Sequence, residues 1–242
     1  MQHDASHDRV RWLAVADVEA LQRDACRRIR DAAAQAMEQR GRFVIVLAGG
    51  STPCGVYQLL REAETNWSRW HIYFGDERCL PADDAGRNSR MAGTAWLDHV
   101  PVPSAQIHAI PAECGVKAAA LAYTETLRDV GDFDLVLLGL GEDGHTASLF
   151  PGHDWTPAAR APDALAVFDA PKPPAQRVSL SATRLSRARE VLFMVAGEAK
   201  RHAVAQWRAA ADIPVRTIRP AAGVDVLVTS ALLEPGPDWG LP

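Results

Sequence analysis

The sequence predicts an α/β protein of three layers (α/β/α), in which helices cover both faces of a mostly parallel sheet. Two observations carry this prediction. Apolar runs of strand length alternate along the chain with segments of helical periodicity. The apolar runs are also nearly continuous, a pattern typical of strands that are buried on both faces of a parallel sheet.

The predicted elements keep this alternation from the start of the chain. A long helix over residues 17–41 ends at Gly41, because glycine readily adopts the left-handed conformation that closes a helix. About forty residues therefore precede the first strand, and they indicate a single helix. The next elements are a strand over 43–50, a helix over 53–64, a strand over 71–77, helices over 89–100 and 116–130, and a strand over 133–141.

The remainder of the chain continues the pattern. Strands are expected over 177–182, 190–197 and 224–233, with a helix over 198–211 between the last two. The proline-rich stretch 170–177 predicts an extended connection that leads into the strand starting at Arg177. We expect one α/β domain over residues 1–242.

The composition is that of an ordinary globular protein and argues against several classes. Of the 242 residues, 48% are hydrophobic and 23% are charged. The formal net charge is −4 and no block of lysine and arginine stands out, which argues against nucleic acid and anionic membranes as partners. The longest apolar runs are too short to span a bilayer. We expect a small-molecule ligand, and a monomer or a weak homodimer.

The cysteines and the N-terminal residues indicate a cytoplasmic protein. The first residues carry acids and histidines and lack the apolar segment of a secretory signal. The cysteines at 26, 54, 79 and 114 include no C-x-x-C pair, so neither a zinc knuckle nor a redox dithiol is indicated. Scattered thiols fit a reducing compartment better than a disulfide scaffold.

Glycine-rich and polar stretches follow four of the predicted strands. In open parallel sheets, ligands bind beyond the carboxyl ends of the strands, so a site is expected where these stretches meet. They are AGGSTP at 48–53, GDER at 75–78, GLGEDGH at 139–145 and GEAK at 197–200.

The first stretch has the composition of an anion site. Pro53 suits the first helical position, with Thr52 as the N-cap before it. Gly49 and Gly50 let the backbone approach a ligand closely, and the free N–H groups of a helix start attract anions. A simple capped turn is the alternative. The lysine of a P-loop is missing, and Pro53 replaces a glycine of the nucleophile elbow, which argues against Ser51 as a nucleophile.

Two further stretches place charges at strand ends. Asp76, Glu77 and Arg78 form either a functional cluster or a surface salt-bridge cluster, since desolvated charges are costly unless they are paired or used. Lys200 falls in the first turn of a predicted helix, where a cation opposes the helix dipole unless an anion is present. Arg177 could point at the same anion. Together these residues suggest a phosphate at one end of the ligand.

The stretch GLGEDGHTASLFPG at 139–152 has two interpretations. Its first six residues match the dinucleotide fingerprint G-x-G-x-x-G, with Asp163 and Asp169 near the distance expected for a ribose-binding acid. Several prolines interrupt the region between, which argues against a regular nucleotide-binding unit. We therefore expect no nucleotide cofactor.

The favoured interpretation of this stretch is a catalytic loop. Asp143 and His145 flank a glycine, and Thr146 is expected to cap a short helix that follows. A histidine at a helix start is favoured in its neutral form, which is the form that a general base needs. Asp143 and His145 are too few ligands for a catalytic zinc, and His3 and His7 lie in a polar N-terminal segment, so no metal is expected.

At this point the residues resemble a known family. AGGSTP, FGDERCLP, NSRM at 88–91, GLGEDGHTASLFPG, PKPPAQRVSLS and GEAK occur in the order found in the 6-phosphogluconolactonases, over about residues 43–205. The resemblance implies a Rossmann-like fold of the phosphosugar isomerase/deaminase type. It also implies a carboxylic ester hydrolase that converts 6-phospho-D-glucono-1,5-lactone to 6-phosphogluconate in the pentose phosphate pathway, without metal or cofactor.

The resemblance also implies roles for single residues. His145 matches the general base that activates water, and Asp76 and Arg78 match residues near the lactone. The residues themselves leave open whether Asp143 or Asp76 supports the imidazole. The residues expected around the phosphate are Gly50, Ser51, Thr52, Arg177 and Lys200.

Two alternatives remain within the same resemblance. One is a related phosphosugar isomerase or deaminase. The deaminases carry a glutamate five residues after the histidine, and Phe150 at that position argues against deamination. The other is a non-catalytic sugar-phosphate sensor, which usually has an added DNA-binding domain. The residues before the first predicted strand do not indicate a helix-turn-helix.

Overall fold

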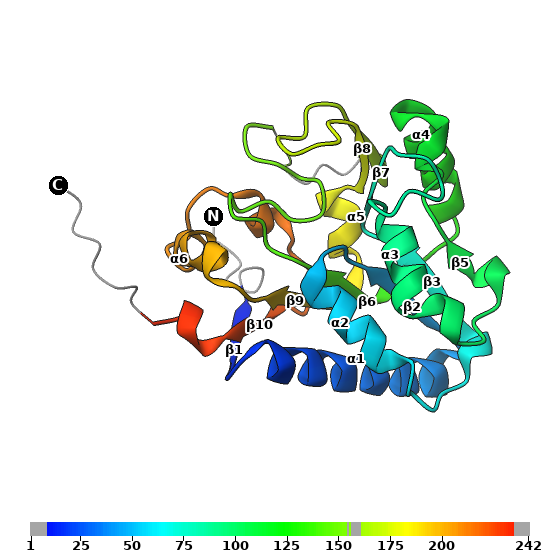
Figure 1. The fold of residues 1–242 in the computed structure, drawn as a ribbon, viewed down its shortest axis with the longest axis horizontal. Coiled ribbons are helices and arrows are strands. Elements are labelled where there is room, and N and C mark those ends of the chain that lie inside the picture. Colours follow the sequence, from blue (N-terminus) through cyan, green and yellow to red (C-terminus); the bar gives the residue numbers. More distant parts are fainter. Residues whose placement is uncertain (1–8, 154, 156–160, 235–242) are drawn as a thin grey trace, which may run out of the picture.

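A parallel sheet of seven strands forms the centre of the computed structural model, which describes residues 9–153, 155 and 161–234 (Figure 1). Every neighbouring pair in this sheet is parallel. The predicted three-layer α/β fold is therefore confirmed. In spatial order the strands are β1 (Val10–Val15), β10 (Val224–Thr229), β9 (Ala188–Val195), β6 (Phe133–Leu138), β2 (Phe43–Leu47), β3 (Trp70–Phe74) and β5 (Ile107–His108).

The central strands β2 and β6 supply the most deeply buried part of the core. All residues of both strands are buried. Burial of a valine, leucine, isoleucine or phenylalanine side chain contributes roughly 1.5–3 kcal/mol, so these strands fix the middle of the sheet firmly. The loops that leave their carboxyl ends consequently start from rigid supports.

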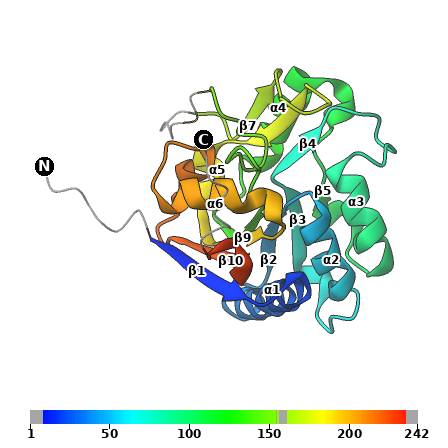
Figure 2. The same cartoon turned by 60° about the vertical axis from the view of Figure 1, so that its left-hand side comes forward.

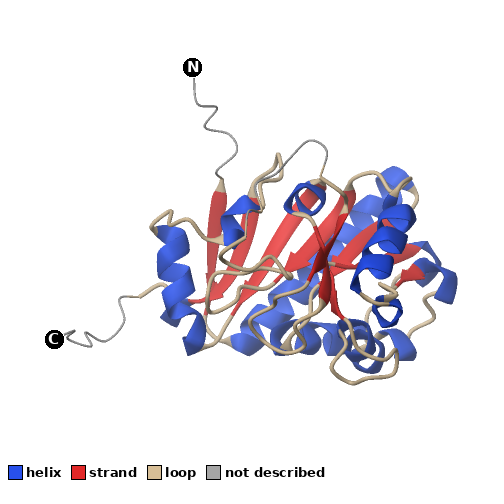
Figure 3. Ribbon diagram, turned by 90° about the horizontal axis from the view of Figure 1, so that it is seen from above, coloured by secondary structure: helices blue, strands red, loops and turns tan. Residues whose placement is uncertain are grey.

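Helices cover the sheet on both sides, as Figures 1 and 3 show. The helices α1 and α2 lie on one side and α5 and α6 on the other, which Figure 2 shows from a second direction. Within the described residues, no helix combines the length and the apolar character that crossing a membrane requires. The helices are α1 (Val18–Arg40), α2 (Ser51–Leu60), α3 (Asn88–Ala95), α4 (Val116–Leu127), α5 (Ala182–Ser186) and α6 (Arg201–Arg208).

Local signals explain the ends of α1. The side chain of Asp17 accepts a hydrogen bond from the backbone N–H of Ala20 (2.7 Å) and so caps the first turn. Gly41 follows the last turn with φ 76° and donates its N–H to the Met37 carbonyl (3.0 Å). The predicted helix over 17–41 is thereby confirmed to within a residue at each end.

A second, antiparallel sheet of three strands lies beside the main sheet. Its order is β4 (Asp76–Arg78), β8 (Arg177–Leu180) and β7 (Ala164–Val167). The expectation of one strand over 71–77 was wrong. The strand β3 ends at Phe74, and after Gly75 the chain enters the small sheet as β4. The strand that starts at Arg177 is confirmed, but it pairs in this small sheet with β4 and β7.

Several other expectations differ from the structure. The strand β1 precedes α1, so the described part of the first forty residues contains a strand as well as the expected helix. β1 is an edge strand whose partner β10 lies near the other end of the chain. The helix α2 starts at Ser51, which makes Gly50 the residue before it and excludes Thr52 as the N-cap. The helices predicted over 89–100 and 198–211 are shorter in the structure, where α3 ends at Ala95 and α6 runs only from Arg201 to Arg208. His3 and His7 lie outside the described residues.

The neighbouring strands β2 and β6 lead their chains in opposite directions. After β2 the chain continues through α2 to β3 on one side, whereas after β6 it returns toward β9 on the other side. In open α/β sheets the crevice that binds ligands lies at the carboxyl ends of two such strands. The topology therefore positions a site above β2 and β6.

His71 and His108 on adjacent strands generate a prediction about pH. Their rings stack in parallel (centroids 5.9 Å), and His108 also stacks on Tyr73 (4.3 Å). Burial lowers the pKa of both histidines; the charge of Arg42 adds to this for His71, and His71 itself adds to it for His108. At a pH below about 6.5, the ordinary pKa of histidine, the unfolded chain binds more protons at these two residues than the folded chain does. The free energy of unfolding therefore falls as the pH falls.

We predict that His108→Phe, which keeps a ring on Tyr73 but cannot titrate, loses less stability on acidification than the unchanged protein. The free energy of unfolding in urea should be compared at about pH 7.5 and about pH 5.5, on either side of the ordinary histidine pKa. His202→Phe removes an exposed histidine of α6 and serves as the control. Equal acid-induced losses in all three proteins would contradict this account.

Candidate active site

A cavity of about 280 Å³ opens at the carboxyl edge of the main sheet. It lies at the ends of β2, β3 and β6, where the topology predicts a crevice. Among the residues that the sequence singled out, Ser51, Thr52 and Asp143 do not line this cavity. The residues from the expected set that do line it are Gly50, Asp76, Arg78, His145, Arg177 and Lys200.

His145 follows β6 and lines the cavity with a half-buried imidazole. Its Nδ1 is hydrogen-bonded to the Asp143 carboxylate, which also accepts the His145 backbone N–H (3.2 Å). With Nδ1–H donated to a carboxylate, the Nε2 atom keeps its lone pair and is able to accept a proton. Partial burial alone would raise the pKa of Asp143, but the charge and hydrogen bonds of His145 outweigh it and lower this pKa.

The backbone around His145 differs from the expected short helix. Residues 145–150 form a tight turn with an isolated bridge between Thr146 and Leu149. The hydroxyl of Thr146 donates to the Gly139 carbonyl (2.9 Å) and caps no helix. The expectation that a helix start keeps His145 neutral was therefore wrong, because the turn folds back on the end of β6.

The imidazole of His145 packs directly on the backbone of Gly141. A Cβ atom at Gly141 would overlap the ring, and the Gly141 N–H also donates to the His145 carbonyl (2.7 Å). Phe150 contacts the same ring (centroids 4.6 Å). Only glycine at 141 leaves room for this ring, so the second glycine of the G-x-G-x-x-G pattern serves to seat a side chain.

Asp76 is the buried acid of the cavity wall, with a relative exposure of 7%. Its Oδ2 accepts a hydrogen bond from the Ser148 hydroxyl (2.6 Å), and its Oδ1 accepts one from the Asn88 side-chain amide (2.9 Å). Burial raises the pKa of Asp76, against the lowering effect of Ser148. Asp76 thus makes no hydrogen bond to His145, and the structure pairs His145 with Asp143 instead.

Arg78 and Arg177 face each other across the small sheet. They are directly opposite in the β4–β8 register, where like charges repel. Arg78 donates to the Gly86 carbonyl (2.6 Å), while its buried Nε has no hydrogen-bond partner among the described residues. Burial lowers the pKa of Arg177, and Arg78 adds to this effect. Two adjacent guanidinium groups on a cavity wall create a positive field that favours an anionic ligand.

The guanidinium group of Arg177 is largely committed to the backbone. It donates to the carbonyls of Lys172 (2.9 Å) and Pro174 (3.2 Å). The expectation that Arg177 points at an anion is thus modified: Arg177 lines the cavity and also holds the proline-rich segment in place. This segment carries Lys172 to the cavity wall, a residue that the sequence did not single out as a ligand contact.

Lys172 and Lys200 bring two ammonium groups to the edge of the cavity. Lys200 ends a short 3-10 turn (Glu198–Lys200) immediately before α6. Burial lowers the pKa of Lys200. The charge of Lys172 lowers this pKa further, whereas the charges of Glu142 and Asp143 oppose the effect. Lys172 pairs with Glu142 (3.5 Å). Lys172 and Lys200 therefore line the same cavity as Arg78 and Arg177, and this group of cations would stabilise a dianion there.

The acids required by the dinucleotide interpretation lie elsewhere. Asp163 forms ion pairs with Arg184 (3.4 Å) and Arg187 (3.6 Å), and neither Asp163 nor Asp169 lines the cavity. Among the described residues, no three histidine, cysteine, aspartate or glutamate side chains are grouped so that they could hold a metal ion.

Sequence reasoning did not identify three residues that the fold brings to the site. Ser148 and Asn88 reach it because the turn after His145 and the start of α3 both meet β4, and Lys172 reaches it through the carbonyl contacts of Arg177. Their presence in the quoted NSRM, TASLF and PKPP stretches was the available signal. Their roles depend on contacts between segments far apart in the chain.

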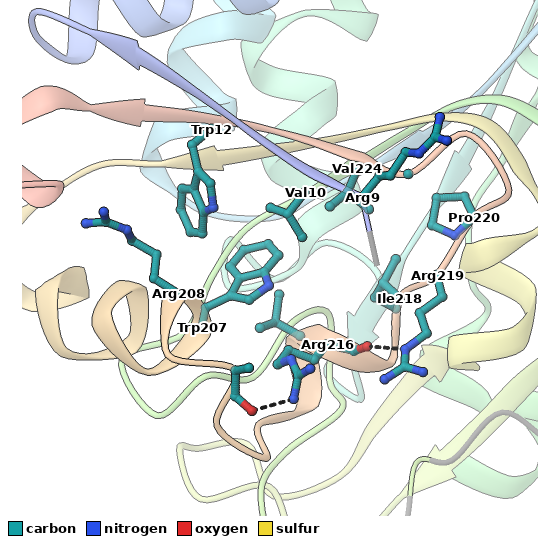
Figure 4. A pocket seen from close by; sticks show the side chains of 13 residues that line it. Arg9, Val10, Trp12, Trp207, Arg208, Arg216, Ile218, Arg219, Pro220 and Val224 are labelled. Carbon is teal, nitrogen blue, oxygen red and sulfur yellow. Dashed lines mark hydrogen bonds between the residues drawn. The ribbon is translucent and has the colours of Figure 1, made fainter. Parts of the chain in front are cut away.

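A second cavity, of about 220 Å³, lies between β1 and α6 (Figure 4). Arginines surround it, but Figure 4 shows that the guanidinium groups of Arg9 and Arg208 point in different directions. Arg208 donates to the Leu233 carbonyl (2.9 Å), and Arg216 donates to the Ala210 carbonyl (2.6 Å). Among the described residues that line this cavity there is no acid and no histidine.

The known proteins that this chain resembles point to one family. The family model described as glucosamine-6-phosphate isomerases/6-phosphogluconolactonase matches residues 16–227. The chain is 38% identical to 6-phosphogluconolactonase from Mycobacterium leprae over 86% of this chain and 89% of that protein. It is 39% identical to the Synechocystis protein of the same name over 77% and 81% of the two chains.

Solved structures show the same fold. The crystal structure of 6-phosphogluconolactonase from Thermotoga maritima superimposes with a TM-score of 0.84 at 26% identity, covering 92% of this chain and all of that one. The 6-phosphogluconolactonase from Trypanosoma brucei gives a TM-score of 0.83 at 27% identity, covering 93% and 98% of the two chains. A monomeric glucosamine-6-phosphate deaminase has a TM-score of 0.80 at 19% identity and thus shares the fold.

The seat of the imidazole on Gly141 leads to a direct prediction. Gly141→Ala should displace the His145 ring and weaken its bond to Asp143, because the new methyl group occupies the space of the ring. Gly139→Ala is the matched control, since a Cβ atom there meets nothing within 4 Å. The ¹⁵N resonances of the His145 ring, recorded by NMR, should shift in Gly141→Ala and stay nearly constant in Gly139→Ala. Unchanged resonances in both variants would contradict this arrangement.

Proposed function

The chain belongs to the glucosamine-6-phosphate isomerase/6-phosphogluconolactonase family, and we propose that it hydrolyses 6-phospho-D-glucono-1,5-lactone to 6-phosphogluconate. One observation carries the proposal most strongly. The same cavity is lined by an imidazole with an available Nε2 and by the four cations Arg78, Lys172, Arg177 and Lys200. A lactone with a remote phosphate needs both features.

The proposed reaction begins with water beside His145. Nε2 takes a proton from this water, whose oxygen attacks C1 of the lactone and forms a tetrahedral oxyanion. Asp143 stabilises the imidazolium that forms and keeps the ring oriented, as in other histidine–carboxylate pairs. His145 then returns the proton to the ring oxygen as the C1–O bond breaks. No covalent intermediate is needed.

The hydrogen bonds of the cavity support Asp143 as the partner of the base. Asp143 bonds to His145 Nδ1, whereas both oxygens of Asp76 are bonded to Ser148 and Asn88. In this proposal Asp76 faces the lactone and accepts hydrogen bonds from its hydroxyl groups. Arg78 lines the cavity beside Asp76 and is the proposed donor to the oxyanion.

Lys200 and Lys172 are the proposed side-chain contacts of the phosphate. Ammonium groups bind phosphate as point charges, and the backbone around Gly50 adds N–H donors at the start of α2. Arg177 contributes its positive charge, and its hydrogen bond to the Lys172 carbonyl holds Lys172 in place. Ser51 and Thr52 open this helix, but neither lines the cavity, so the proposal assigns them no direct contact with the phosphate. Binding at this remote end supplies positioning for the reaction at C1.

Phe150 favours the lactonase over the deaminase alternative. The resemblance implies that the deaminases carry a relay glutamate at this position. Here the residue is a buried phenylalanine that packs on the His145 ring and cannot transfer a proton. We further propose a cytoplasmic location, which the four free cysteines support because thiols persist in reducing compartments.

We predict that His145→Asn lowers the turnover of freshly prepared 6-phosphogluconolactone by about 10²–10⁴-fold, the usual contribution of a general base. The assay must subtract spontaneous hydrolysis. His153→Asn, an exposed histidine that does not line the cavity, is the matched control and should retain activity. The mutant His145→Asn should still bind 6-phosphogluconate. Full activity in His145→Asn would exclude this residue as the base.

A second prediction concerns the phosphate. Lys200→Met should raise the KM for 6-phosphogluconolactone by roughly tenfold or more, because it removes a charged contact that is worth about 1.5–3 kcal/mol. Hydrolysis of unphosphorylated gluconolactone should change little, since that substrate has no group to bind there. Steady-state kinetics with both lactones provide the comparison. An equal effect on the two substrates would place Lys200 outside the phosphate site.

A further inference from the structure

The carboxylate of Asp76 is held by one neutral donor on each oxygen. Ser148 Oγ donates to Oδ2 (2.6 Å), and Asn88 Nδ2 donates to Oδ1 (2.9 Å). Since each carboxylate oxygen accepts more than one hydrogen bond, both oxygens retain capacity toward the cavity that Asp76 lines. The two donors therefore fix the plane of the carboxylate and leave each oxygen able to accept another hydrogen bond.

The surroundings of Ser148 determine where its hydroxyl proton goes. Ser148 is fully buried and follows His145 by three residues. Its backbone N–H donates to Ser179 Oγ (3.2 Å), while the Ser179 hydroxyl donates to the Leu180 carbonyl (3.0 Å). Ser148 thus connects three parts of the site: the turn that carries His145, the strand β8, and the carboxylate on β4.

The residue before Ser148 shows that this connection is under constraint. Ala147 has φ 47°, a left-handed conformation that is uncommon for residues other than glycine. Such a conformation persists only where the surrounding contacts enforce it. The two hydrogen bonds of Ser148 follow directly after Ala147, so they are well positioned to enforce this turn beside His145.

We propose that Ser148 is a positioning residue, whose hydroxyl orients the Asp76 carboxylate toward the substrate and links it to the turn that carries His145. The inference rests on the lactonase function proposed above. It means that the acid on β4 and the base after β6 are held in register by one buried hydroxyl. Ser148 itself does not touch the reacting atoms, because its proton is bonded to Asp76.

The charge on Asp76 depends on the groups that face it. Glu77 and Arg78 lie beside it on β4, Arg177 faces it from β8, and the neutral donors Asn88 and Ser148 approach from α3 and the turn. Burial raises the pKa of Asp76, and the Ser148 hydrogen bond is the largest opposing influence. Removal of this hydroxyl must therefore raise the pKa of Asp76 further.

The test compares Ser148→Ala with Ser179→Ala. Each variant removes one fully buried hydroxyl. Ser148→Ala removes a hydrogen bond from Asp76 and keeps the backbone N–H that contacts β8, whereas Ser179→Ala removes the acceptor of that N–H and leaves the bond to Asp76 in place. The acid limb of the kcat/KM profile should move to higher pH in Ser148→Ala, because the Asp76 carboxylate loses a donor that favours its charged form. The acid limb of Ser179→Ala should stay close to that of the unchanged protein.

Two results would overturn the inference. If the acid limb moved equally in both variants, Ser148 would only hold the turn in place. If the acid limb of Ser148→Ala did not move, Ser148 would have no influence on Asp76 during the reaction. Circular dichroism establishes that the variants are folded. If Ser148→Ala does not fold, Ser148→Cys provides the same comparison, since a thiol is of similar shape and a much weaker donor.

A measurement without substrate separates this inference from the proposed function. The ¹³C resonance of the Asp76 carboxyl group, assigned with Asp76→Asn, reports its titration by NMR. We expect a higher pKa for Asp76 in Ser148→Ala than in Ser179→Ala. If the unchanged protein failed to hydrolyse the lactone, the proposed function would be wrong, whereas an identical titration of Asp76 in both variants would refute the role of Ser148 alone.

Discussion

The strands β2 and β6 lie side by side at the centre of the sheet, and their chains leave toward opposite faces. This divergence leaves a space above their carboxyl ends that neither connection fills, and the cavity occupies it. Because both strands are buried throughout, the loops start from positions that the core holds fixed. The precision of the site, including the seat of His145 on Gly141, depends on that rigidity.

The charged groups of the cavity come from different elements of the fold. The acid–base pair His145 and Asp143 follows β6, whereas Lys172 and Lys200 reach the cavity from loops near β8 and α6. Desolvation disfavours each charge, and the neighbouring guanidinium groups of Arg78 and Arg177 repel one another. In the proposed function, a phosphorylated ligand relieves the excess of positive charge that these side chains create, while Nε2 of His145 has no protein partner among the described residues.

Elements with strong local signals could be predicted from the sequence, and those determined by distant partners could not. The helix α1 and the strands β2 and β6 have continuous periodicity or apolar character, and the structure confirms them, although both strands end three residues before their predicted ends. The strand β1 was missed because its partner β10 lies at the far end of the chain. In the site, the grouping of strand ends was foreseeable, whereas the turn at Thr146 and the contacts of Ser148 and Lys172 arise only from tertiary structure.

The orientation of the bound sugar acid tests the account most directly. A crystal structure with 6-phosphogluconate should have the phosphate beside Lys200 and Lys172 and the C1 carboxylate beside Nε2 of His145. This result would support hydrolysis at the end of the ligand remote from the cations. A phosphate beside His145, or a ligand bound only in the cavity between β1 and α6, would contradict the assignment of the two ends.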